Sequence, residues 1–148
     1  MKKINIYWVI AGLLIIIQVF RIDKTHPPFL PEQDFITISN PPDNFYSMLK
    51  NSCYDCHSYE TEYPWYSNVA PVSWFLKMHV NEGRSHLNFS DWGNFDTEKS
   101  NIQFKKCIKV IEDGEMPLIS YTLLHLKARL NENKRLRLAS WIKSQQKM

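Results

Sequence analysis

Two cysteines and a histidine lie close together in the first half of the chain, as Cys53, Cys56 and His57. Two thiols three residues apart on a helical turn can each reach one of the two vinyl groups of a haem. The histidine next to the second thiol is then held beneath the iron as an axial ligand. The motif therefore predicts one covalently attached haem c, bound through Cys53 and Cys56, with His57 as the proximal iron ligand.

Three other interpretations of the cysteine pair explain less of the motif. A zinc site needs four ligands, usually as two spaced pairs, and the chain has no second pair. A thioredoxin-like dithiol is typical of a βαβ setting, and no segment alternates at period two. A disulfide between Cys53 and Cys56 would leave His57 without a role. The third cysteine, Cys107, falls on the apolar side of an expected helix and is interpreted as a small buried hydrophobe.

The ligand on the other side of the iron is predicted from the loops. Met116 is the expected distal ligand, because its thioether is a soft ligand for iron and it lies in a loop before Pro117. Three histidines, His79, His86 and His125, are alternatives, and an empty sixth position is a further one.

The N-terminus has the pattern of an export signal. Lys2 and Lys3 precede an apolar run over residues 4–20. No small-residue cleavage site follows the run, which favours an uncleaved signal anchor or transmembrane helix over residues 1–21. The leading lysines place the N-terminus in the cytoplasm and the rest of the chain in the periplasm, at a bacterial inner membrane.

The remaining chain is predicted to be an all-α domain with long loops. A proline-rich linker over residues 22–42 is expected to be extended, as a spacer or as a strap on the domain that follows over residues 43–148. The expected helices cover residues 44–53 (capped by Asp43), 72–83, Thr97 or Ser100 to Asp113 (ended by Gly114) and 132–146 (capped by Asn131).

Composition limits the class of protein. The 148 residues suffice for one domain, and 44% hydrophobic and 14% aromatic residues suit a packed core. A net charge of +3 argues against a dedicated nucleic-acid binder. Basic residues gather near the C-terminus, where they form either a solvated helix face or a docking face for an acidic protein or anionic lipid. They are Lys127, Arg129, Lys134, Arg135, Arg137, Lys143 and Lys147.

The pattern over residues 44–146 resembles class I cytochrome c and is more closely similar to the small bacterial haem-binding domain family related to it. The resemblance rests on Ser52–Ser58, Tyr63–Ser67, Val69–Trp74, Glu82–Ser90 with Trp92, Gly114–Pro117, and Tyr121–His125 with Ala128–Leu130. It implies haem at Cys53 and Cys56, His57 as proximal ligand and Met116 as distal ligand. Leu118 stands where the family often has a second proline.

These features together predict a membrane-anchored monohaem protein that transfers single electrons between redox partner proteins in the periplasm. One alternative is a haem-based sensor or binding module with a labile sixth ligand. Another is a small haem peroxidase, whose acid–base groups would have to come from His79, His86 or His125. No catalytic constellation stands out beyond the haem motif, so an electron carrier is favoured over an enzyme.

Overall fold

Every regular element in residues 5–146, the part of the chain that the computed structural model describes, is helical. The predicted all-α class is therefore confirmed. The α-helices are α1 (Ile6–Ile16), α2 (Phe35–Ser39), α3 (Asp43–Leu49), α4 (Asp55–His57), α5 (Val72–His86), α6 (Thr97–Glu112), α7 (Ile119–Leu124) and α8 (Glu132–Ser144). A π-helical turn (Lys50–Tyr54) joins α3 to α4, and shorter 3₁₀ turns cover Ile17–Val19, Pro31–Gln33, Trp65–Asn68, Phe89–Asn94 and Leu126–Ala128.

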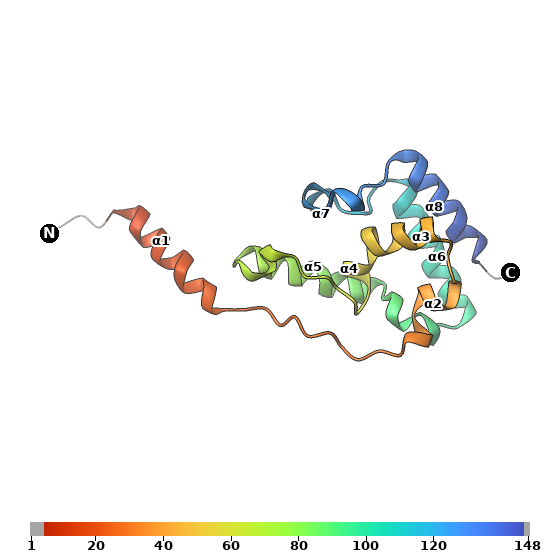
Figure 1. Ribbon diagram of the computed structural model, residues 1–148, viewed down its shortest axis with the longest axis horizontal. Coiled ribbons are helices and arrows are strands. Elements are labelled where there is room, and N and C mark those ends of the chain that lie inside the picture. Colours follow the sequence, from red (N-terminus) through yellow and green to blue (C-terminus); the bar gives the residue numbers. More distant parts are fainter. Residues whose placement is uncertain (1–4, 147–148) are drawn as a thin grey trace.

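Helix α1 stands apart from the domain at one end of the molecule (Figure 1). Asn5 caps it by accepting a hydrogen bond from the Tyr7 amide at 3.1 Å, and the 3₁₀ turn that follows ends at Val19. Within residues 5–146, no helix is both long and apolar enough to cross a membrane. The transmembrane helix expected over residues 1–21 is therefore not found in that part, and Lys2 and Lys3 lie outside the described residues.

The segment expected as a linker is structured over its second half. Residues 22–30 are extended, as predicted, but the 3₁₀ turn Pro31–Gln33 and helix α2 follow. Asp34 caps α2 by accepting from the Ile36 amide at 2.9 Å. Phe35, only 2% exposed, then enters the hydrophobic core. The expectation of an extended segment to residue 42 is wrong from residue 31 onward, because one cap and one buried aromatic stabilise a short helix.

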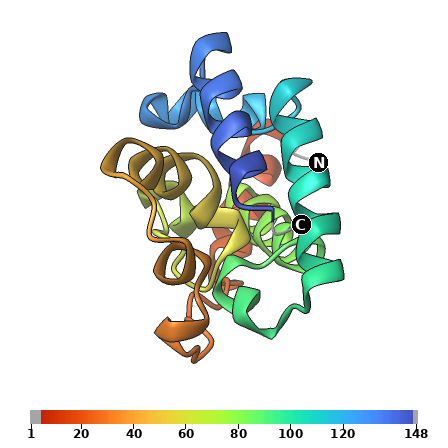
Figure 2. The ribbon, with the colours of Figure 1, turned by 90° about the vertical axis from the view of Figure 1, so that its right-hand side faces the viewer.

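The core is formed where α6 and α8 pack against each other and against aromatic side chains from earlier elements. Phe35 lies at its centre, with ring centroids 4.7 Å from Trp92, 5.3 Å from Phe89 and 5.9 Å from Phe104. Figure 2 shows α6 and α8 side by side along one side of the domain. Burial of these large rings holds the short helices and turns together.

Most predicted helix boundaries are close to the observed ones. Asn131 caps α8 through the Lys134 amide, and Gly114 ends α6 with a φ of 73°, both as predicted. Asp43 is the first residue of α3 rather than its cap, a place taken by Pro42. Two differences are larger: α5 continues to His86, beyond the expected end at residue 83, and α7 was not predicted.

Candidate cofactor site

The cysteine–histidine motif lies on one continuous helical stretch. Cys53 belongs to the π-helical turn after α3, and Cys56 and His57 belong to α4. Both cysteines are free thiols and both are partly buried. The helical path from α3 to α4 places the two thiols about one turn apart, the arrangement that double attachment to a haem requires.

The His57 imidazole is oriented by a backbone carbonyl. Its Nδ1 atom lies 3.1 Å from the carbonyl oxygen of Leu87, which directly follows α5. A neutral imidazole that donates from Nδ1 keeps the lone pair on Nε2 available for a metal. The imidazole and the Phe89 ring are arranged edge to face, with centroids 6.4 Å apart at 71°. In this geometry one ring nitrogen is held by a hydrogen bond, and the other is the one that could bind a metal.

Burial keeps this histidine neutral. Loss of solvent lowers the His57 pKa, and nearby His86 lowers it further, while hydrogen bonds to the carbonyls of Leu87 and Gly83 act in the opposite direction. The pKa of His57 is lowered overall. A neutral imidazole is the form that binds metal, since a protonated ring has no lone pair to offer.

The two thiols are also neutral. Burial raises the pKa of Cys53 to about 12, with Cys107 and Cys56 adding to the effect. Burial raises the pKa of Cys56 to about 11, Asp55 adds to it and Arg84 opposes it. In residues 5–146, no three His, Cys, Asp or Glu side chains are grouped so that they could hold a metal ion directly.

Helix α5 packs closely on the motif at Gly83. A Cβ atom at this position would lie 2.7 Å from the Cys56 carbonyl oxygen and 3.2 Å from the Cys56 Cβ. The next residue, Arg84, donates to the Ser58 carbonyl at 2.8 Å and to Thr61 Oγ1 at 2.9 Å. The contact at Gly83 and the two Arg84 hydrogen bonds fix α5 relative to the motif and to the loop that follows it.

A second group of polar side chains lies beside Cys56. Tyr66 Oη is 2.7 Å from His125 Nε2, and the Tyr121 ring stacks on the His125 ring at 4.2 Å and 12°. Tyr121 Oη also donates to Asp55 Oδ2 at 2.5 Å. Burial is the main cause that raises the pKa of both tyrosines, and Asp55 contributes in each case. The network connects the end of α7 to α4, and within it His125 Nε2 is hydrogen-bonded to Tyr66.

This network could not be recognised from the sequence, apart from one signal. Tyr121 and His125 are four residues apart, the spacing at which side chains on a helix meet. Tyr66 and Asp55 reach them only through the tertiary fold, because they lie more than fifty residues earlier in the chain.

The other predicted iron ligands lie on different elements of the domain. Met116 is partly buried in the turn between α6 and α7, and its amide donates to the Val110 carbonyl at 3.1 Å. His79 is half-buried, with Nδ1 2.7 Å from the Phe75 carbonyl of its own helix. His86 is exposed at the end of α5. The assignment of Met116 as distal ligand stays a prediction.

Helix α7 presents apolar side chains that no described part of the protein covers. Four of them are exposed on α7 and the turn after it: Ile119, Leu123, Leu124 and Leu126. Several exposed apolar side chains on one short segment are candidates for contact with a partner or ligand. With two reduced thiols and an oriented neutral imidazole nearby, the residues present fit a large, flat and largely apolar cofactor such as haem.

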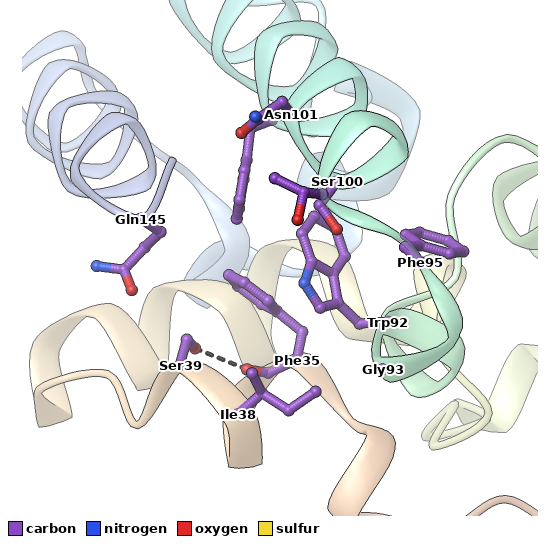
Figure 3. A pocket seen from close by; sticks show the side chains of 11 residues that line it. Phe35, Ile38, Ser39, Trp92, Gly93, Phe95, Ser100, Asn101 and Gln145 are labelled. Atoms are coloured by element: carbon purple, nitrogen blue, oxygen red, sulfur yellow. Dashed lines mark hydrogen bonds between the residues drawn. The ribbon is translucent and has the colours of Figure 1, made fainter. Parts of the chain in front are cut away.

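Two hollows in the surface have none of the three motif side chains in their lining. One, of about 780 Å³, lies between α3 and the segment after α7, where Lys50, Asp55, Tyr121 and His125 line it. The other, of about 310 Å³, is shown in Figure 3, where Phe35 and Trp92 project into it from α2 and from the turn before α6. Cys53, Cys56 and His57 line neither hollow, so neither is the predicted attachment site.

Comparison with known proteins gives one match. The family model described as the haem-binding domain matches residues 12–144, which is most of the chain. No curated protein and no solved structure matches the chain. The relationship to class I cytochrome c stays a prediction.

Proposed function

The chain belongs to the haem-binding domain family, and we propose that it carries one haem c, linked covalently to Cys53 and Cys56, with His57 as the proximal iron ligand. The observation that carries the proposal is the hydrogen bond from His57 Nδ1 to the Leu87 carbonyl, which places the lone pair of the neutral ring on Nε2, in a motif with two free thiols. Metal-binding histidines characteristically have a carbonyl or carboxylate partner of this kind.

A bound haem would supply one-electron redox chemistry, and the chain would supply its ligands, orientation and surroundings. The Leu87 carbonyl holds the His57 ring in one orientation and one tautomer. The buried Phe89 ring covers the edge of the imidazole and excludes water from it. Gly83 allows α5 to approach the Cys56 backbone, so the carbonyl that orients His57 is held in place.

We further propose Met116 as the distal ligand and single-electron transfer as the activity. Thioether ligation raises the reduction potential of haem iron and leaves no open coordination position, which suits a carrier rather than a sensor or a peroxidase. This part rests on the soft thioether of Met116 and its place in a turn beside the exposed apolar side chains of α7.

The location proposed for the domain is the periplasmic side of a bacterial inner membrane, with redox proteins as partners. The apolar run over residues 4–20 and the lysines before it support this proposal, and so do the exposed side chains of α1. The apolar segment would attach the domain to the membrane, and the haem would be added outside the cytoplasm.

The test is a pyridine haemochrome spectrum of the full chain expressed together with a cytochrome c maturation system. We expect a spectrum typical of two thioether bonds, and haem that stays with the protein in denaturing electrophoresis. The variant Cys53→Ala/Cys56→Ala should lose covalent haem, whereas Cys107→Ala should keep it. A wild-type chain without covalent haem would refute the proposal.

A further inference from the structure

Four exposed apolar side chains gather at the beginning of α5. Trp65 is 78% exposed and Trp74 39%, and Val69 and Val72 are also exposed. We call these four residues the α5 corner. Two tryptophans at the surface of a small domain are unusual, because large apolar side chains are normally covered unless they contact a partner or a membrane.

The α5 corner is joined to the end of the N-terminal apolar segment by a reciprocal pair of hydrogen bonds. Gln18 Nε2 donates to the Ala70 carbonyl at 3.0 Å, and the Ala70 amide donates to Gln18 Oε1 at 3.0 Å. Gln18 is one of only two polar residues within the run over residues 4–20. Its side chain therefore fastens the apolar segment to the backbone of the corner.

Three more contacts extend this attachment. Arg21 Nη1 donates to the Asn68 carbonyl and Lys24 Nζ to Asn68 Oδ1, both at 2.6 Å. The Trp74 indole donates to the Phe20 carbonyl at 3.0 Å. Figure 1 shows α1 leading away from the domain at the end where α5 begins. Any surface that α1 enters will therefore face the α5 corner.

The chemistry around the corner suits the interface of a lipid bilayer. Tryptophan is enriched at that depth, because its ring is apolar and its N–H is polar. Arg21 and Lys24 bind Asn68, which lies between the two tryptophans of the corner in the sequence, and Lys77, within two turns of the start of α5, interacts with Asp23. Excess positive charge next to an apolar patch favours anionic lipid headgroups.

We propose that the α5 corner rests on the membrane surface, in contact with lipid, and so sets the orientation of the domain. This inference rests on the proposed attachment of the N-terminal segment to a membrane and goes beyond it. An apolar segment over residues 6–20 alone would leave the angle of the domain free, whereas the corner and its five hydrogen bonds would hold the domain at one angle. The same end of α5 would then always face lipid.

The inference can be tested with the full chain, carrying haem, in vesicles of phosphatidylethanolamine and phosphatidylglycerol that contain a photoreactive phospholipid. After irradiation, labelled peptides are identified by mass spectrometry. We expect labelling in residues 65–74 as well as in the N-terminal run. Gln18→Ala should reduce labelling of the corner several-fold and leave labelling of residues 6–16 unchanged. Leu136→Glu, a change at an exposed apolar residue of α8, should alter neither.

The outcomes separate this inference from the proposal on which it rests. Labelling confined to residues 6–20 would overturn the proposed contact of the α5 corner with lipid and leave the proposed membrane attachment intact. Labelling of the corner that Gln18→Ala does not reduce would overturn the role of the hydrogen-bonded attachment. No labelling at all would overturn both the surface and the attachment, while the haem spectrum of the same sample would still report on the proposed cofactor.

Discussion

The Nδ1 atom of His57 lies 3.1 Å from the carbonyl oxygen of Leu87, thirty residues later in the chain. The partner is a backbone atom, so no substitution at Leu87 can remove it directly. Its position depends instead on how α5, which ends one residue earlier, packs against α4. The site is therefore sensitive to any change that moves these two helices apart.

The substitution Gly83→Ala should move α5 away from α4. The new Cβ would meet the Cys56 carbonyl oxygen at 2.7 Å, and rigid backbone atoms have little room to yield. Overpacking of this kind costs about 1–3 kcal/mol of unfolding free energy. We expect that loss in urea denaturation of the haem-loaded protein, together with a lower yield of covalent haem. Gly12→Ala, where nothing lies within 4 Å of the new Cβ, is the control and should leave both values unchanged. An unaltered Gly83→Ala protein would contradict the proposed packing.

The motif itself could be predicted from the sequence, because its three side chains are adjacent on one helical stretch. The Leu87 carbonyl could not, since it approaches His57 only after α5 has packed on α4. Phe35 shows the same limit in the core. The prolines around it predicted an extended segment, yet one capping aspartate and one buried ring are enough to form α2. Local sequence patterns indicate where helices can form, but a short helix is stable only where tertiary contacts support it.

Met116→Leu should open the sixth coordination position of the iron. Leucine keeps the volume and the apolar character of the side chain but cannot bind iron. We expect the absorption band of methionine-ligated ferric haem to disappear, and the reduced variant to bind carbon monoxide, which the wild type should not bind readily. Met78→Leu, at an exposed position on α5, is the matched control and should keep the wild-type spectrum. A wild type that binds carbon monoxide rapidly would favour the sensor or peroxidase alternatives.

Tyr121→Phe should weaken the contact between α7 and the motif. The hydroxyl donates to Asp55 Oδ2 at 2.5 Å, with the Asn51 carbonyl as a second, more distant acceptor at 3.3 Å, and the variant loses this donor while the ring can still stack on His125. A hydrogen bond to a partly buried carboxylate contributes about 1–2 kcal/mol. We expect a loss of that size in denaturant unfolding. Tyr46→Phe removes a hydroxyl from an exposed tyrosine of α3 and should cost less than half as much.

Helix α7 and the tyrosine network beside it could not be predicted from the sequence. Residues 119–124 have no capping side chain, and the sequence predicted no helix there. In the fold, Tyr121 and His125 hold it against α4 and the 3₁₀ turn at Trp65–Asn68. A helix that depends on partners far away in the sequence gives little local signal.

Asp34 offers a test of electrostatics at the α2 cap. Its carboxyl is buried, Oδ1 accepts from Tyr54 Oη at 2.8 Å and from the Ile36 amide at 2.9 Å, and Oδ2 has no hydrogen-bond partner in the described chain. Burial raises the pKa of Asp34 above its ordinary value of 3.8, and the two hydrogen bonds only partly oppose this. The folded protein therefore keeps this proton to a higher pH than the unfolded chain does.

This difference fixes the sign of a pH dependence. A carboxyl with a raised pKa in the folded state contributes stability below pH 3.8, and that contribution is lost as the pH rises through the folded-state pKa. Asp34→Asn keeps an oxygen that can accept from Tyr54 and Ile36 but cannot ionise. We expect the unfolding free energy of the variant, relative to wild type, to increase as the pH rises from below 3.8 to neutrality. Urea denaturation of both proteins across this range measures the difference, and a constant or decreasing difference would show that the buried carboxyl does not have a raised pKa.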